Sequence, residues 1–61
     1  MKIRNLNTLH PGQRVTLLRG EHSFPATVEQ ARPGGAVLQT EHGREVLFAA
    51  ELNAGWAIIT A

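Results

Sequence analysis

Two glutamate-histidine pairs at breaks between apolar segments are the first candidates for chemistry in this chain. Glu21-His22 lies in "RGEHSFPATV" and Glu41-His42 lies in "LQTEHGREVLF". Two imidazoles and a carboxylate could hold a divalent transition metal if both turns met at one end of a sheet. Turns also attract polar residues for their backbone geometry alone. The sequence leaves open whether His22 and His42 with Glu21 and Glu41 form a cluster, and we assign no metal and no cofactor.

A catalytic nucleophile is hard to assemble from the remaining residues. Serine occurs once, as Ser23, and the chain contains no aspartate and no cysteine. It has no Gly-x-Ser-x-Gly elbow, and the Pro-Gly-Gly run at 33–35 is too short for a phosphate-binding loop. A domain of this size has no room for a substrate pocket unless subunits build it together. We therefore expect that the protein is not an enzyme and has no small-molecule substrate.

Basic residues are the next candidates, because they neutralise phosphates when a protein binds nucleic acid. Six Lys and Arg against five Glu give a net charge of +1, which does not by itself imply a polyanion partner. Trp56 is the sole tryptophan and the candidate for stacking on a base. The candidate phosphate contacts are Lys2, Arg4, Arg14, Arg19 and Arg32. Arg14 has an alternative role in pairing with a glutamate across strands.

The segments that carry these residues alternate apolar and polar side chains, which is typical of strands. Pro11-Gly12 predicts a type II turn, because proline presets φ and glycine accepts a positive φ. Gly43 is the expected positive-φ residue of a later hairpin turn. A short 3₁₀ or α turn is expected over 50–53, before the last strand. The expected strands cover 13–19, 24–29, 36–40, 44–48 and 56–60.

This order of elements resembles that of small SH3-like barrels. "PGQRVTLLRG" and "FPATVEQ" are similar to the opening of KOW and Tudor-type barrels, which begin with a turn, a Gly-x-x-Val strand and a hairpin. The motif here is Gly12-Gln13-Arg14-Val15, and the resemblance covers 11–59. Around Phe24-Pro25-Ala26 the glycine of a KOW unit is replaced, which favours the broader barrel group. The resemblance implies an all-β, five-stranded SH3-like small barrel over 13–61, after an N-terminal arm over 1–12.

The same resemblance implies a binding module that acts in transcription, translation or DNA handling through its loops. We therefore predict a small non-catalytic module that binds nucleic acid or regulates bacterial gene expression. No apolar run approaches the roughly 18 residues that cross a bilayer, and "MKIRNLNTL" lacks the apolar middle of a secretion signal. We expect a cytoplasmic protein with no membrane partner. The choice between DNA and RNA and any base preference stay open.

The alternative function is protein interaction or homo-oligomeric self-assembly through outward apolar side chains. The expected inner face comprises Val15, Leu17, Ala26, Val28, Leu38, Val46 and Phe48. The expected interface comprises Leu18, Val37, Leu47 and Trp56. Burying several hundred Å² of such a patch at about 25 cal/mol per Å² would supply a free energy comparable to the whole stability of a domain this small. The N-terminal arm could instead cover these side chains through Ile3, Leu6 and Leu9.

A third class, an oligomeric reductase, depends on one strand. Plasmid-encoded type II dihydrofolate reductases are similar to this chain in length and layout, and a Val-Gln-Ile-Tyr strand lines their tetrameric pore. The corresponding stretch here is Val46-Leu47-Phe48-Ala49, in which only Val46 matches. Without the glutamine and the tyrosine, a pterin and a nicotinamide would find no polar partners. We do not assign this activity.

Overall fold

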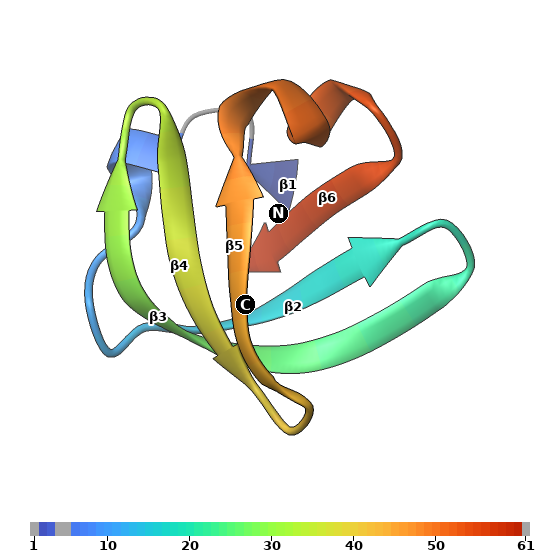
Figure 1. The fold of residues 1–61 in the computed structure, drawn as a ribbon, viewed down its shortest axis with the longest axis horizontal. Helices are drawn as coiled ribbons and strands as arrows, with labels where there is room; N and C mark the ends of the chain where they lie inside the picture. The colour runs from blue at the N-terminus through green and yellow to red at the C-terminus, as the bar shows by residue number, and fades with distance from the viewer. Residues whose placement is uncertain (1, 4–5, 61) are drawn as a thin grey trace.

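One antiparallel sheet accounts for most of the chain in the computed structural model, which describes residues 2–3 and 6–60 (Figure 1). Within these residues the strands are β1 (Lys2–Ile3), β2 (Arg14–Arg19), β3 (His22–Arg32), β4 (Gly35–Thr40), β5 (Gly43–Phe48) and β6 (Trp56–Thr60). The 3₁₀ helices are η1 (Leu6–Thr8) and η2 (Ala49–Asn53). No side chain is described for Lys2, Asn7 and Asn53. The predicted all-β class and the 3₁₀ turn before the last strand are confirmed.

The strand order is β1-β6-β2-β3-β4-β5, so the last strand lies between the first two. β1 is an addition to the predicted five strands and pairs Ile3 with Ile58. η1 is likewise an addition to the single 3₁₀ turn that we expected. Figure 1 shows the sheet folding over, with β4 and β5 crossing the direction of β2. Among the described residues no strand ladder joins β5 to β1.

The turn at Pro11-Gly12 has the predicted type II form. Gly12 has a φ of 88°, and the N–H of Gln13 donates to the carbonyl of His10 at 3.1 Å. The N–H of Gly12 also donates to the carbonyl of Val28 at 2.7 Å, and the N–H of Val28 donates to the carbonyl of Gln13 at 2.9 Å. These bonds attach the N-terminal arm to β3, where a β-bulge follows Val28.

The core lies on one face of the sheet, which we call the inner face, and the opposite face is the outer face. Its buried residues from β2, β3 and β4 are Val15, Leu17, Ala26, Val28, Ala36 and Leu38, as the period of two predicts. Ile58 of β6 completes the strand contribution and is fully buried. Leu6 and Leu9 belong to the same cluster, so the N-terminal arm fills part of the core. Burial of each large aliphatic side chain contributes about 1.5–3 kcal/mol.

The phase of β5 is opposite to the prediction. Leu47, which we expected on the outside, is 1% exposed, whereas Val46 and Phe48, which we expected inside, are 53% and 59% exposed. The cause is the register with β4, because Leu47 pairs with Ala36 on the inner face and Val46 pairs with Val37 on the outer face. Three consecutive apolar residues satisfy either phase of a strand, and a shift of one residue exchanges the two faces.

Truncation of Leu47 tests this phase. Leu47→Ala is expected to lower the free energy of unfolding by about 2–4 kcal/mol, because it leaves a cavity in the core. Val46→Ala, at a side chain more than half exposed, is expected to cost less than about 1 kcal/mol. Urea denaturation at low protein concentration, followed by circular dichroism, measures both losses. A larger loss at Val46 than at Leu47 would contradict the register.

Candidate functional site

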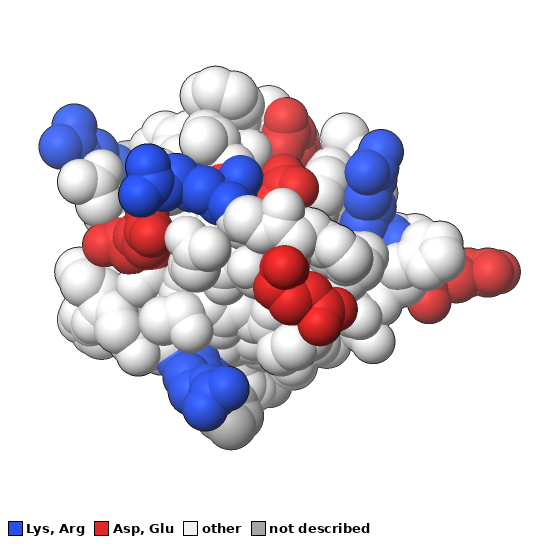
Figure 2. All heavy atoms as spheres, turned by 60° about the horizontal axis from the view of Figure 1, so that its bottom comes forward, with Lys and Arg blue, Asp and Glu red and all other residues white. Residues whose placement is uncertain are grey.

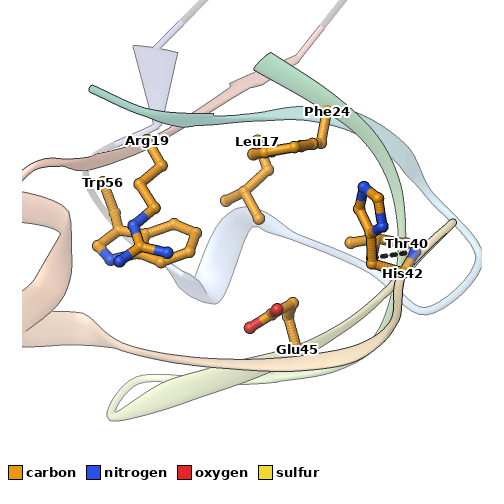
Figure 3. Close-up of a pocket in the computed structure, with 7 residues that line it drawn as sticks. All are labelled: Leu17, Arg19, Phe24, Thr40, His42, Glu45 and Trp56. Atoms are coloured by element: carbon orange, nitrogen blue, oxygen red, sulfur yellow. Dashed lines mark hydrogen bonds between the residues drawn. The ribbon is translucent and has the colours of Figure 1, made fainter. Parts of the chain in front are cut away.

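A cavity of about 240 Å³ opens at one end of the inner face (Figure 3). It is lined by Leu17, Arg19, Phe24, Thr40, His42, Glu45 and Trp56. Apart from His42, which is in a turn, these residues lie on strands in the same inward register as the core. The volume is below the roughly 300–1,000 Å³ of sites that enclose drug-sized ligands. The cavity therefore suits a single ring rather than a whole cofactor.

One wall of the cavity is a cation stacked on an aromatic ring. Arg19 on β2 and Trp56 on β6 are direct cross-strand partners. The guanidinium carbon of Arg19 lies 5.1 Å from the centroid of the Trp56 ring, within the range of a cation–π contact. The N–H of Gly20 donates to the carbonyl of Gly55 at 3.2 Å, which joins the loops next to both residues. The wall is thus fixed by backbone as well as by side chains.

The rings of Phe24 and His42 line the other side of the cavity, and a third ring, that of His22, packs on Phe24 without lining the cavity. The Phe24 ring lies 6.3 Å from the His22 ring at an interplanar angle of 24°, and 5.9 Å from the His42 ring at an angle of 86°. Both imidazoles therefore pack on Phe24, and Figure 3 shows His42 facing Arg19 and Trp56 across the cavity. Among the described residues no three His, Cys, Asp or Glu side chains are placed to bind a metal ion.

The turn that positions His42 is held by the hydroxyl group of Thr40. The N–H of His42 donates to Thr40 Oγ1 at 3.1 Å, and this hydroxyl donates to the carbonyl of Gly43 at 2.9 Å. Gly43 has a φ of 112°, which confirms the predicted positive φ. Glu41 Oε1 lies 3.6 Å from His42 Nε2, but both side chains are about two-thirds exposed, so this contact contributes little.

Glu45 supplies an acidic group to the cavity. It lies opposite Leu38 on the inner face of β5, and Figure 3 shows its carboxylate projecting into the space between the two walls. An ionised carboxylate only accepts hydrogen bonds, so it suits an amino group on a ligand. Arg19 only donates and carries a positive charge, so it suits an anionic group. The cavity thus offers aromatic faces, one positively charged hydrogen-bond donor and one negatively charged hydrogen-bond acceptor.

The predicted phosphate contacts do not gather on one surface of the described structure. Arg14 and Arg19 lie at opposite ends of β2 and on opposite faces of the sheet. Arg32 lies on the outer face at the far end of β3, beside the turn to β4. Arg4 lies outside the described residues, as does the side chain of Lys2. Figure 2 shows basic and acidic side chains interspersed over the face that it presents.

The predicted interface residues are also separated from one another. Leu18 and Val37 are half-buried on the outer face, whereas Trp56 is half-buried in the wall of the cavity. Leu47 is in the core, so the prediction that it faces outward is wrong. The four predicted residues therefore do not form one apolar surface.

Thr40 and Glu45 line the cavity but were not predicted from the sequence as site residues. A signal for such a site exists in the strand register. Arg19 continues the inward row of Val15 and Leu17, and a charged residue at the inward end of a strand indicates that the core opens there. Glu45 likewise continues the inward row of Leu47 on β5, but the phase predicted for this strand was wrong.

No protein-family model, curated protein or solved structure matches this chain. In the described part of the chain, none of the helices has the length and apolarity of a bilayer-spanning segment.

Removal of Arg19 tests the structure of the cavity wall. Because Trp56 is the only tryptophan, its fluorescence reports on this wall alone. Arg19→Ala is expected to shift the emission to longer wavelength and to increase quenching by acrylamide, because the ring loses its cover. The free energy of unfolding should fall by about 0.5–1 kcal/mol. Arg14→Ala, on the other face of β2, is the control, and equal shifts in the two variants would contradict the contact.

Proposed function

We propose that this protein is a small non-catalytic module that binds single-stranded nucleic acid and takes one unstacked base into the cavity. The observation that carries the proposal is the stacked pair of Arg19 and Trp56 facing Phe24 across a space sized for one ring. Single strands are bound by aromatic side chains on which bases stack, together with cationic groups that contact the backbone. Both elements are present on the inner face.

The charge of Arg19 favours an anionic ligand over a cationic one. Its guanidinium covers the Trp56 ring, so a cation entering the cavity would meet a like charge at the aromatic face it needs. A phosphate would instead receive charge-assisted hydrogen bonds from the guanidinium. The flat guanidinium also stacks on nucleobases, so Arg19 can contact a base and its phosphate together.

Glu45 gives the proposed site a base preference. A carboxylate accepts a hydrogen bond from the exocyclic amino group of cytosine, and thymine and uracil present a carbonyl oxygen at the same position. Two acceptors facing each other are unfavourable when both lose water. The Thr40 hydroxyl already makes hydrogen bonds within its own turn. Glu45 is therefore the group that would distinguish one base from another. We therefore propose a preference for cytosine over thymine and uracil.

The positions of the other basic residues set the salt dependence. Arg14 and Arg32 lie on the outer face and away from the cavity. A strand that runs through the cavity would thus be neutralised by Arg19 and by few other groups. Lys2 and Arg4 remain proposed phosphate contacts of the N-terminal arm. With one to three phosphates neutralised, log K should fall with log salt at a slope of only about −0.7 to −2.

We also propose that the curved sheet is a small SH3-like barrel of the KOW and Tudor type. Its support is the order of elements, in which β2 to β5 form a meander, η2 follows, and β6 returns to pair with β2. This proposal assigns the protein to bacterial gene expression and to the cytoplasm, where bacterial nucleic acid is found.

Binding of a labelled single-stranded oligonucleotide at low salt, followed by fluorescence anisotropy, tests the proposed ligand. Arg19→Ala and Trp56→Leu are each expected to weaken binding roughly 5- to 150-fold, since one stacked base contributes about 1–3 kcal/mol. Arg14→Ala should bind nearly as the unmodified protein does. Absence of binding at low salt, or equal losses in Arg14→Ala and Arg19→Ala, would contradict the proposal.

The base preference has its own test. Oligo-dC is expected to bind more tightly than oligo-dT, and Glu45→Gln should reduce the ratio of the two affinities, because the amide is a poorer acceptor and can also donate. Competition between the two oligonucleotides in the same anisotropy assay measures the ratio. A ratio that Glu45→Gln leaves unchanged would exclude Glu45 from base recognition while leaving the stacking site intact.

A further inference from the structure

The last strand in the sheet order, β5, has one edge that no strand of the described residues covers. The N–H of Ala49 donates to the carbonyl of Gly34 at 3.0 Å, which fixes the alternation of the ladder between β4 and β5. In this alternation the N–H groups of Arg44, Val46 and Phe48 point away from β4. The carbonyls of Arg44 and Val46 do the same, whereas that of Phe48 leads into η2.

The same strand carries the two exposed large hydrophobic residues of the described structure, Val46 and Phe48. Val46 lies beside Val37 of β4 on the outer face. Phe48 lies opposite Gly35, and its Cδ1 would be at an ordinary contact distance, 3.6 Å, from a Cβ placed there, so the ring lies beside this glycine. An apolar row therefore runs across the outer face up to the open edge.

Edge strands are usually protected by charged side chains that oppose pairing with another strand. Arg44 is the basic residue of this edge, but its Nε lies 2.9 Å from Oε2 of Glu29 on β3. Since β4 separates β5 from β3, the guanidinium reaches back over the sheet. Its charge is paired with Glu29 there, while the Arg44 side chain stays 67% exposed and its aliphatic part begins at the edge.

We propose that β5 forms the interface of a symmetric dimer and pairs antiparallel with β5 of a second copy of this chain. The two-fold axis passes through the middle of the Val46 pair. Each Val46 then exchanges both of its backbone hydrogen bonds with Val46 of the second copy. Each Phe48 N–H donates to the Arg44 carbonyl of the second copy, and the Phe48 ring packs on the aliphatic part of Arg44.

The side chains on the outer face select a second copy, because they match in this register. Across the axis the order is Val37, Val46, then Val46 and Val37 of the second copy, which is a continuous apolar row. Cross-strand apolar pairs of this kind stabilise a sheet. A two-fold interface has to be complementary to itself, which this row is.

Other registers are less favourable. A shift of two positions in one direction places Glu45 opposite Glu45 of the second copy, and like charges in direct opposition are destabilising. A shift in the other direction places Arg44 opposite Ala50, which belongs to η2 and is not extended. A shift of one position would place outer-face residues of one copy opposite inner-face residues of the other. The centre at Val46 is the register in which the edge N–H groups of Val46 and Phe48 both find an acceptor.

Sedimentation equilibrium over micromolar to millimolar concentrations tests the dimer. The unmodified protein is expected to approach twice the 6.6 kDa of one chain. Val46→Glu sets two carboxylates against each other at the axis and is expected to remain monomeric throughout. Thr16→Glu places the same charge on an exposed residue of β2 and should dimerise as the unmodified protein does. A monomer at millimolar concentration, or a dimer that persists in Val46→Glu, would overturn the proposal.

Engineered cysteines test the register, because the chain contains no cysteine. In Val46→Cys the two Cα atoms would be about 5.5 Å apart, a distance that a disulfide spans. In Phe48→Cys they would be about 13 Å apart along the strands, four residues at about 3.3 Å each. Mild oxidation should cross-link Val46→Cys and leave Phe48→Cys unlinked. Equal cross-linking in both variants, or more in Phe48→Cys, would overturn the register.

Discussion

The pairing of β6 with β2 is the contact on which the rest of this structure depends. It joins segments from opposite parts of the chain and sets Ile58 opposite Leu17, at the centre of the core. The same ladder sets Trp56 opposite Arg19, which creates one wall of the cavity. β1 can join the sheet only because β6 is in place. Core, cavity and sheet order thus follow from one long-range ladder.

Local patterns predicted the parts of the fold that local chemistry determines. The turn at Pro11-Gly12 and the positive φ of Gly43 follow from the conformations that proline and glycine favour. The inner rows of β2 and β3 follow largely from the alternation of apolar with polar residues, whereas the row of β4 was predicted correctly although Ala36, Val37 and Leu38 are all apolar. In β5 alternation fails, because Val46, Leu47 and Phe48 are all apolar. Pairing with β4 decides the phase there, and that pairing is a property of the folded chain.

The candidate site was predicted only in part for the same reason. Arg19 and Trp56 were both identified from their side-chain chemistry, but as members of different groups. Nothing local indicates that they stack, because their contact depends on the register between β2 and β6. Phe24 was expected inside and is a half-buried wall residue, since the inner face opens where the strands end. Long-range register, rather than residue type, defines this cavity.

The hydrogen bond from Gly20 to Gly55 has a consequence for how the cavity behaves in solution. It ties the β2–β3 hairpin to the loop before β6, and both glycines hold positive φ values, 60° and 102°, that other residues rarely adopt. Fraying of either loop would release this bond and separate Arg19 from Trp56 at the same time. The wall therefore exists only while the closing strand is docked, and local opening at this end removes it without unfolding of the whole sheet.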